Sequence, residues 1–587
     1  MTPKFSLYYG NQLHTLDAVN GAVYTLDEQV TVTVSATTYT DFDAVEWVLF
    51  LENAGNKNSQ IFSRIFDCDT LLPLPQTDAS RPGYMPKPGD LCVITMNGII
   101  EGSNYWENDP KSATEFSFHR EYLGKNTDTK TFSSEGGLSS DTMMPFFHIT
   151  AKDSGYIAAI GWSGGWQAEC VKTDGGVRFK SGLQKARFYL KPGEKLRTTG
   201  SLIMKYASQE DQYNKFRRLI RRHFSHPGKE GLLAFELWGG LTSEEMKKRL
   251  NQLKDHGICF EDVWIDAGWY GQCTKCDDAF SGDWGTHAGE WEVNARVHPE
   301  KLRDVSACAQ EGGMNLMLWL EPERARRETP IVAERPEYFL LPEDENDPNL
   351  LLNYDNNEAF DYIYRTICGF VEDLSLSCYR QDFNVKLAPY CKNNDEKDRI
   401  GITEIKHITA MYRLWDALLE KFPGLIINNC SGGGRRIDIE TLRRSIPFFR
   451  SDYQCNFNET PEVLQAHNAN ISRYLPYNGC TSKTKGDTYA IRSSYSSSWG
   501  GAFYNAIFQS MTEADFLWAK KVTDDYRAIR KYLSKDFYNH GADVYDTTSW
   551  TIWQYNDEET KSGIAIEEHF YDDIGNEIKS CSYNTLD

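Results

Sequence analysis

The sequence of 587 residues lacks the features that would point to a membrane, to secretion or to a nucleic acid. It contains no run of the roughly 20 apolar residues that a membrane-spanning helix needs, so we expect no membrane partner. Met1–Gly10 lacks the basic start and apolar core of a signal peptide, which predicts a cytoplasmic protein, or a secreted one if its native signal is missing here. The formal net charge of −21 repels phosphate backbones, and we expect no nucleic acid partner.

Signals of metal and nucleotide binding are also missing. The 14 cysteines are irregularly spaced in a long chain, which predicts free thiols rather than a disulfide framework. Cys273 and Cys276 form a CxxC, and no second CxxC follows. This pair could be half of a zinc site, a redox pair or a coincidence. No H-x-H or H-x-x-x-H pair lies at the expected strand ends, and no glycine-rich turn follows the first parallel strand. We therefore expect neither a metal nor another cofactor.

Aromatic residues are present in excess. The chain contains 15 Trp, 32 Tyr and 30 Phe, which make up 13% of its residues. Flat aromatic faces stack on sugar rings, but proteins rich in β-strands are also rich in aromatics, and composition alone favours the second explanation. The length exceeds one compact core, so we expect two or three domains.

Residues 1–205 have the pattern of β-strands. Val30–Val34 alternates with a period of two, as a half-buried strand does. The runs Trp47–Leu51, Phe147–Thr150 and Tyr156–Ile160 are short and bounded by turn residues. The pattern predicts an N-terminal β-supersandwich domain over 1–205, followed by a linker helix within 206–230.

The pattern changes at about Gly231, where strands begin to alternate with helices. Thr242–Glu245 begins a helix with a capping signature. Apolar strands are predicted at 232–236, 262–266, 314–319, 377–382, 425–428 and 448–452. Repeated alternation predicts a parallel sheet, and six or more units with long loops favour a (β/α)8 TIM barrel over a doubly wound sheet. We place the catalytic barrel at 231–532 and a C-terminal β domain, short or truncated, at 533–587.

Acidic residues fall where the predicted strands end. They are Asp266, Glu321, Asp382 and Asp452. In a barrel these ends converge on the face where active sites lie. Hydrolysis of a glycosidic bond needs two facing carboxyl groups, one ionised and one protonated. Arg380 is close enough in sequence to favour the ionised form of Asp382. An Asp at a strand end is more often a helix cap or an ion-pair partner, so spacing alone leaves the assignment open.

Short motifs in a fixed order reduce this ambiguity. They are Gly161–Trp166, Trp264–Trp269, Leu318–Glu323, Tyr379–Asn384, Cys430–Asp438 and Arg450–Tyr453. Together they resemble the motifs of glycoside hydrolase family 36, which contains α-galactosidases and α-N-acetylgalactosaminidases. The resemblance extends over about 500 residues, and the order of the motifs carries it rather than any single one.

The resemblance implies roles for individual residues. Asp382 would be the nucleophile and Asp452 the general acid/base of a retaining mechanism, with their carboxyl groups roughly 5–6 Å apart, whereas about 9 Å would indicate inversion. The implied sugar contacts are Asp266, Trp269, Trp319, Arg380, Asn384, Cys430 and Gly432, with Trp166 as a lid from the sandwich domain. Glu321 and Glu323 would support the site from behind.

Three positions depart from the family pattern. Ala267 stands where most of the family has a second aspartate, which removes one hydroxyl contact. Arg380 stands in place of a lysine and Gln381 in place of a tryptophan. These changes leave the chemistry intact, but 2-amino and 2-acetamido galactosides then compete with plain α-galactosides as substrates.

Simpler explanations of the motifs stay open. Gly432–Gly434 could form a mere tight turn, Trp162 and Trp166 could be core residues, and Glu321–Glu323 could cap a helix. Transglycosylation would use the same catalytic residues. A catalytically silent carbohydrate-binding protein and a metal-dependent hydrolase are alternatives of other classes.

The function expected from the sequence is that of a retaining, exo-acting α-glycosidase. Its partner would be an α-galactoside or α-galactosaminide, in an oligosaccharide or a glycoconjugate. The resemblance is also compatible with a homo-oligomer.

Overall fold

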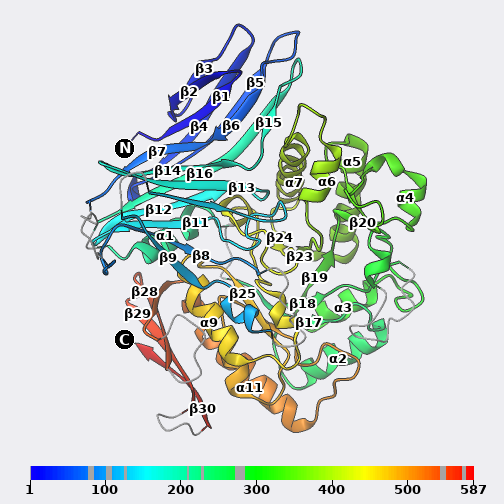
Figure 1. Ribbon diagram of the computed structural model, residues 1–587. Coiled ribbons are helices and arrows are strands. Elements are labelled where there is room, and N and C mark those ends of the chain that lie inside the picture. Colours follow the sequence, from blue (N-terminus) through cyan, green and yellow to red (C-terminus); the bar gives the residue numbers. More distant parts are fainter. Residues whose placement is uncertain are drawn as a thin grey trace.

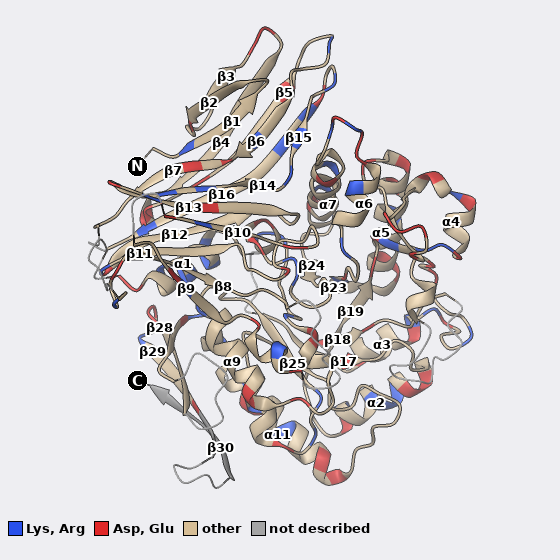
Figure 2. Cartoon of the chain, in the orientation of Figure 1, with Lys and Arg blue, Asp and Glu red and all other residues tan. Residues whose placement is uncertain are grey.

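The computed structural model describes residues 2–76, 85–100, 109–124, 128–207, 210–225, 231–271, 284–541, 550–571 and 577–586. Three parts follow one another along the chain: antiparallel sheets, a parallel sheet covered by helices, and a small antiparallel sheet (Figure 1). Acidic and basic residues are interspersed over all three parts (Figure 2). None of the helices in these ranges is long and apolar enough to cross a membrane.

The part of the N-terminal region that the structure describes contains two sheets of four strands and one of eight. Their strands are β1 (Lys4–Tyr9), β2 (Gln12–Asp17), β3 (Val23–Thr25), β4 (Val30–Tyr39), β5 (Ala44–Asn53), β6 (Phe62–Phe66), β7 (Cys68–Pro73), β8 (Cys92–Met96), β9 (Phe118–Tyr122), β10 (Thr129–Ser133), β11 (Phe146–Ala151), β12 (Ser154–Gly161), β13 (Trp166–Thr173), β14 (Gly176–Leu183), β15 (Arg187–Phe188) and β16 (Lys195–Tyr206). In β4, Val30, Val32 and Val34 are buried and the residues between them are half-buried, which confirms the predicted period of two.

The helix α1 (Gln212–His223) leads from the sheets into the central part, as predicted. It begins at Asp211, whose side chain accepts a hydrogen bond from the backbone N–H of Asn214. Its buried residues Phe216 and Leu219 pack in one cluster with residues of both neighbouring parts. The helix therefore joins the two parts through a shared core.

Within its described residues, the central part contains seven parallel strands in the order β24-β23-β19-β18-β17-β26-β25. They are β17 (Leu233–Leu237), β18 (Asp262–Ile265), β19 (Asn315–Leu320), β23 (Leu376–Gln381), β24 (Ile426–Asn429), β25 (Gly479–Ser482) and β26 (Ser498–Gly501). The main covering helices are α2 (Ser243–Asp255), α3 (Arg303–Glu311), α5 (Asn357–Leu374), α7 (Ile402–Lys421), α9 (Pro461–Ile471) and α11 (Glu513–Leu533). The Thr242 side chain accepts from the backbone N–H of Glu245 at 3.2 Å, which confirms the predicted cap of α2.

The strand predicted at 448–452 is not a regular strand. The chain instead forms an isolated parallel bridge to β24 through Ile446 and one hydrogen bond to β25 through Pro447. The Ile446 N–H donates to the Ile427 carbonyl at 2.9 Å, and the Gly479 N–H donates to the Pro447 carbonyl at 3.1 Å. Pro447 has no N–H to continue a ladder, and a 3-10 helix, η6 (Asp452–Cys455), begins five residues later.

Smaller elements complete the fold. The C-terminal sheet contains β27 (Asp536–Asn539), β28 (Thr551–Asp557), β29 (Ser562–Tyr571) and β30 (Glu577–Leu586), all antiparallel. The remaining elements of the central part are β20 (Arg324–Arg326), β21 (Phe339–Leu340), β22 (Asn349–Leu352), α4 (Pro330–Glu334), α6 (Ala388–Asn394), α8 (Ile439–Leu442) and α10 (Thr488–Ser493). The eleven cysteines whose side chains are described are all free thiols.

Candidate active site

The polar residues singled out in the sequence follow the parallel strands at their carboxyl ends. Asp266 follows β18, Glu321 follows β19, Asp382 follows β23, Cys430 follows β24, and Asp452 begins η6. The strand pairs β18·β19, β19·β23 and β23·β24 are all parallel, so their carboxyl ends lie at one edge of the sheet. The structure therefore brings these residues to one face.

The Asp382 carboxylate receives hydrogen bonds on both oxygens. Its Oδ2 accepts from Trp319 Nε1 at 3.0 Å and from Asn384 Nδ2 at 2.9 Å. Its Oδ1 accepts from the backbone N–H groups of Phe383 at 2.8 Å and Gly432 at 3.1 Å. This fixed set of donors orients the carboxylate and favours its charged form.

The guanidinium of Arg380 supplies the balancing charge. It lies over the ring of Trp264, 4.4 Å from the centroid, and its Nε is 3.5 Å from Oδ1 of Asp266. Burial alone would raise the pKa of Asp382, but Arg380 and the hydrogen bonds outweigh burial and hold that pKa below its usual value. Asp382 is therefore ionised at neutral pH, which is the state a nucleophile needs.

Asp452 is in the opposite electrostatic situation. Burial, followed by the negative charge of Asp382, raises its pKa from 3.8 to about 7, although Arg435 and Arg380 act in the other direction. A carboxyl group with this pKa carries a proton for much of the time at neutral pH. It can therefore donate a proton to a leaving oxygen and take one from water.

A glycine turn lies directly against Asp452. Gly433 has φ +76°, in the left-handed region that favours glycine. A Cβ at this position would lie 2.9 Å from the backbone nitrogen of Asp452 and 2.9 Å from Cα of Ser451. The turn thus contributes its Gly432 N–H to Asp382 and packs its next residue against Asp452, so it connects the two carboxylates.

Asp266 forms a third wall of the site. It is half-buried, and its Oδ1 accepts from Trp264 Nε1 at 3.1 Å. Burial raises its pKa to about 6, with Arg380 opposing the shift and Glu236 adding to it. The neighbouring Ala267 is buried and offers no polar group.

Trp319 stands among aromatic residues that sequence reasoning missed. Tyr270 stacks on it with ring centroids 5.7 Å apart, and Trp284 and Trp291 meet it edge-on at 5.7 and 6.3 Å. Trp284 and Trp291 belong to the long loop after β18, where no strand or helix pattern marks them. One signal could have indicated them: after Trp269, further tryptophans follow the predicted strand 262–266 on its carboxyl side.

Several predicted sugar contacts are buried, and two of them, Trp166 and Trp269, have no exposed surface. Trp166 is fully buried, and its Nε1 donates to the Ser139 carbonyl at 2.6 Å. Trp269 is also fully buried, donates to the Trp319 carbonyl at 2.9 Å and meets Phe370 of α5 edge-on. Both indoles are core residues in this conformation because their faces are covered by protein.

A buried ion pair that sequence reasoning missed lies beside Asp266. Glu236, at the end of β17, accepts from Lys483 Nζ at 3.2 Å and from Asn505 Nδ2 at 2.8 Å. Its charge raises the pKa values of Asp266 and Cys455. Glu236 and Lys483 lie in short strand ends of mixed composition, so no sequence motif revealed them.

Glu323 binds together the region behind Asp382. It accepts from Arg436 Nη1 at 2.6 Å, from His407 Nε2 at 2.7 Å and from Gln381 Nε2 at 2.9 Å. Gln381 also accepts from Trp415 Nε1 at 2.6 Å, so its side chain lies among the helices rather than at the site. The departure at Gln381 therefore changes the support of the nucleophile strand and not the substrate surface.

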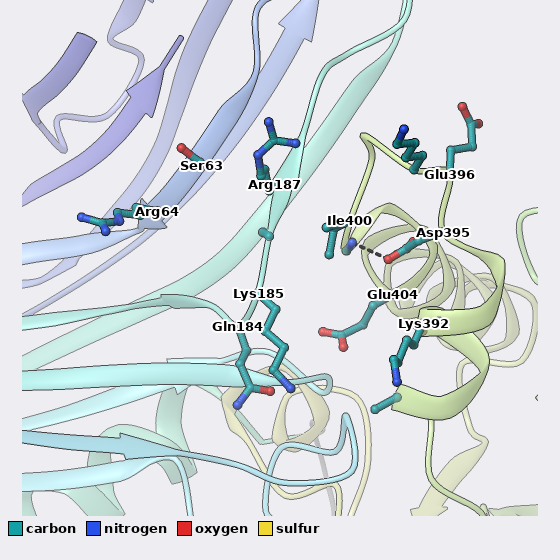
Figure 3. A pocket seen from close by; sticks show the side chains of 15 residues that line it. Ser63, Arg64, Gln184, Lys185, Arg187, Lys392, Asp395, Glu396, Ile400 and Glu404 are labelled. Atoms are coloured by element: carbon teal, nitrogen blue, oxygen red, sulfur yellow. Dashed lines mark hydrogen bonds between the residues drawn. The ribbon is translucent and has the colours of Figure 1, made fainter. Parts of the chain in front are cut away.

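One cavity of about 930 Å³ lies away from these carboxylates, between the N-terminal sheets and the helices α6 and α7. Figure 3 shows Glu404 directed into this space, near the loop that carries Gln184 and Lys185. Glu404 accepts from Trp162 Nε1 at 3.0 Å, so the motif Gly161–Trp166 borders this cavity. None of the predicted site residues lines it.

The structure bears on metal binding only in its described residues. Over the described ranges, no group of three or more His, Cys, Asp and Glu residues has an arrangement that could hold a metal ion. Cys273 and Cys276 lie outside the described residues, so half of a zinc site, a redox pair and coincidence all stay open as explanations of this CxxC.

Comparisons with known proteins point in one direction. The family model described as Melibiase matches residues 200–458. The chain is 25% identical over 334 residues to α-galactosidase AgaA of Geobacillus stearothermophilus, covering 53% of this chain and 44% of that protein. It is 22% identical over 513 residues to α-galactosidase Mel36A of Lactobacillus acidophilus, covering 80% of this chain and 64% of that protein. It thus spans about half to two thirds of these relatives.

Solved structures share the fold. The α-galactosidase of Lactobacillus brevis superposes with a TM-score of 0.76 at 16% identity, covering 95% of this chain and 72% of that chain. A variant of AgaA from Geobacillus stearothermophilus in complex with raffinose gives a TM-score of 0.75 at 17% identity, covering 97% and 81%.

Proposed function

We propose, from the premise that the chain belongs to the Melibiase family through its residues 200–458, that it is a retaining α-galactosidase. It would release terminal α-linked galactose from an oligosaccharide or glycoconjugate by double displacement. The observation that carries the proposal is the contrast between its two aspartates. Arg380 and four hydrogen bonds keep Asp382 ionised, whereas burial and Asp382 raise the pKa of Asp452 to about 7.

The proposed mechanism has two steps. In the first, an Asp382 oxygen bonds to the anomeric carbon, the glycosidic C–O bond breaks, and Asp452 gives its proton to the departing oxygen. In the second, Asp452 takes a proton from water, the water oxygen attacks the anomeric carbon, and the bond to Asp382 breaks. The two inversions return the sugar with its α configuration.

We further propose that the central part is a complete (β/α)8 barrel and that the N-terminal part is a supersandwich. The hydrogen bonds of 446–449 to both β24 and β25 support the first proposal, because they occupy the place of an eighth strand. The large antiparallel sheets of the N-terminal part support the second proposal.

The sugar contacts proposed for the site are Asp266, Trp319, Arg380, Asn384, Cys430 and Gly432. Asp266 and Arg380 support this best, because their polar atoms pair 3.5 Å apart and lie beside Asp382. The substrate class rests on relatives that are named α-galactosidases and on variants of one of them, AgaA, solved in complex with raffinose and with stachyose. Because Ala267 stands where most of the family has an aspartate, α-N-acetylgalactosaminides and α-galactosaminides stay alternative substrates.

The test is release of nitrophenol from the α-galactoside, the α-N-acetylgalactosaminide and the α-galactosaminide, with Asp382→Ala as control. Cleavage of one of them, lost in the variant, supports the class and identifies the 2-substituent. A folded protein that cleaves none of the three contradicts the proposal. A catalytically silent carbohydrate-binding protein would then be the better explanation, and galactose binding by calorimetry would examine it.

A further inference from the structure

A short segment of the N-terminal part reaches the wall that carries Asp452. It consists of the 3-10 helix η3 (Pro110–Thr114) and Glu115 directly after it. His467 of α9 contacts the Ser112 carbonyl at 2.7 Å through Nε2. Ala113 packs in one buried cluster with Tyr453, Val463, Leu464 and Cys480. The segment is therefore part of the packed interior of the central part.

Glu115 makes the polar contact of this segment with the turn at Asp452. It is fully buried, and its Oε2 accepts a hydrogen bond from Ser451 Oγ at 2.6 Å. Such a length is typical of a hydroxyl donating to a carboxylate, which is a strong hydrogen bond. The two residues are 336 positions apart in the chain.

Ser451 transmits this contact to the backbone around Asp452. Its Oγ also accepts from the backbone N–H of Tyr453 at 3.1 Å, which caps the start of η6. When the hydroxyl donates its hydrogen to Glu115, its lone pairs face the Tyr453 N–H. The two bonds thus fix the Ser451 rotamer and the direction in which the Asp452 side chain points from the backbone.

The glycine turn holds the same residues from another side. Gly433 packs against Ser451 and the nitrogen of Asp452 so closely that a Cβ would not fit. The turn itself is tied to the N-terminal part, because Ser140 Oγ donates to the Gly434 carbonyl at 2.6 Å. The backbone of Asp452 is therefore held between two contacts that both lead to the N-terminal part.

We propose that Glu115 is a positioning residue for the acid/base, holding the 451–453 turn so that the Asp452 carboxyl meets the leaving oxygen. This inference rests on the proposed function. It assigns to the N-terminal part a role in proton transfer, beyond its packing. Glu115 touches no reacting atom and acts through Ser451.

The expected signature is a dependence on the leaving group. An alcohol leaves only with a proton from the acid, whereas 2,4-dinitrophenolate leaves readily without one. Glu115→Ala should lower kcat/KM, which reports the first step alone, by about 10- to 100-fold for raffinose, because a displaced catalytic group loses much of its effect. It should lower kcat/KM for 2,4-dinitrophenyl α-galactoside by less than about 3-fold. Glu115→Gln keeps an acceptor oxygen and should lie between wild type and Glu115→Ala.

Asp67→Asn is the matched control. Asp67 is another fully buried carboxyl of the N-terminal part, and it accepts from the hydroxyls of Thr198 and Thr199. Its variant should lose stability and keep the wild-type ratio of the two rates. Equal losses on both substrates in Glu115→Ala, or no loss on either, would overturn the proposal.

A crystal structure of Glu115→Ala separates this inference from the proposed function. A displaced or rebuilt 451–453 turn supports the positioning role whatever the substrate is, and an unchanged turn overturns it. Failure of the proposed function shows differently, as a wild-type protein that releases nothing from any galactoside. If Glu115→Ala does not fold, Glu115→Gln and Ser451→Ala carry the same two measurements.

Discussion

The walls that carry Asp382 and Asp452 contain the same residue type and are built in opposite ways. The Asp382 wall is assembled within the central part, where a regular strand, a guanidinium and donors on both carboxylate oxygens hold it. The Asp452 wall is an irregular stretch followed by a 3-10 helix, and within the described residues its carboxyl receives no hydrogen bond. Its support comes from Ser451, Gly433 and, through Glu115, from the N-terminal part.

The difference shows how one fold can give two aspartate side chains different chemical roles. A group that stays ionised needs many donors and a fixed cation, and the interior of a parallel sheet provides both. A group that exchanges a proton needs a desolvated position and few partners, and a looser wall provides that. The comparison can be challenged by changing one wall at a time.

The largest effect is expected from Asp382→Ala. Loss of the attacking oxygen should lower kcat by about 10⁴-fold or more, measured as nitrophenol release by protein whose circular dichroism is unchanged. Added azide should restore part of the rate by entering the vacated space, giving a product with inverted configuration. A variant that keeps more than about a tenth of the wild-type rate would contradict the assignment.

Asp452→Asn should have the next largest effect, and a selective one. We expect kcat for raffinose to fall by about 10²- to 10⁴-fold, because general acid catalysis is lost. An activated dinitrophenyl substrate should lose much less in the first step. Comparable losses for both substrates in kcat/KM, which reports the first step alone, would mean that Asp452 does not protonate the leaving group.

The coupling between the two walls should appear in the pH profile. The basic limb of kcat/KM should have a midpoint near 7, the pKa to which burial and Asp382 raise Asp452. In Asp382→Asn the negative neighbour is removed, so the pKa of Asp452 should fall. Carbon NMR of labelled aspartate in both proteins measures it, and an unchanged pKa would show that the walls are electrostatically independent.

The raised pKa also predicts a stability change of definite sign. The folded protein binds the Asp452 proton between pH 3.8 and about 7, where the unfolded chain releases it. Its contribution to the free energy of unfolding is therefore full below the unfolded pKa and is lost as the pH rises through the folded pKa. Asp452→Asn should raise Tm relative to wild type at about pH 8 more than at about pH 5. Equal differences at the two pH values would argue against the raised pKa.

The smallest effect on activity is expected from Trp166→Phe. The substitution removes the hydrogen bond to Ser139 and some buried surface, so Tm should fall by a few degrees, about 1–2 kcal/mol of stability. Because the indole is fully buried, KM should stay within about twofold of wild type. A large rise in KM would restore the predicted role of Trp166 as a lid over the sugar.

Local patterns in the sequence predict much of this arrangement and fail where contacts are distant. The cap at Thr242, the alternation in Val30–Val34 and the acidic ends of β18, β19 and β23 depend on neighbours in the chain, and the structure has them. The strands β25 and β26, with the sequences GCTS and SWGG, lack an apolar run and were not predicted.

The local sequence does not predict where a side chain points or which distant residues it contacts, and the reason is physical. The burial of Trp166 depends on Ser139 and on sheets that pair far along the chain, and a tryptophan next to glycines fits a core as well as a lid. The bond between Glu115 and Ser451 joins residues that nothing in their local sequences connects. Such contacts are set by the fold as a whole.

The hydrogen bonds of Glu323 have a consequence for how this site could change over time. Gln381 is bonded to Glu323 and Trp415, while Arg436 and His407 share the same carboxylate. Replacing Gln381 alone leaves the buried groups of Glu323 and Trp415 without this partner, so a single substitution should cost more stability than one in which a partner changes with it. The residue beside the nucleophile is therefore epistatic with Glu323 and Trp415 directly, and with Arg436 and His407 through Glu323. A variant that replaces Gln381 would therefore need a matching substitution at one of its partners.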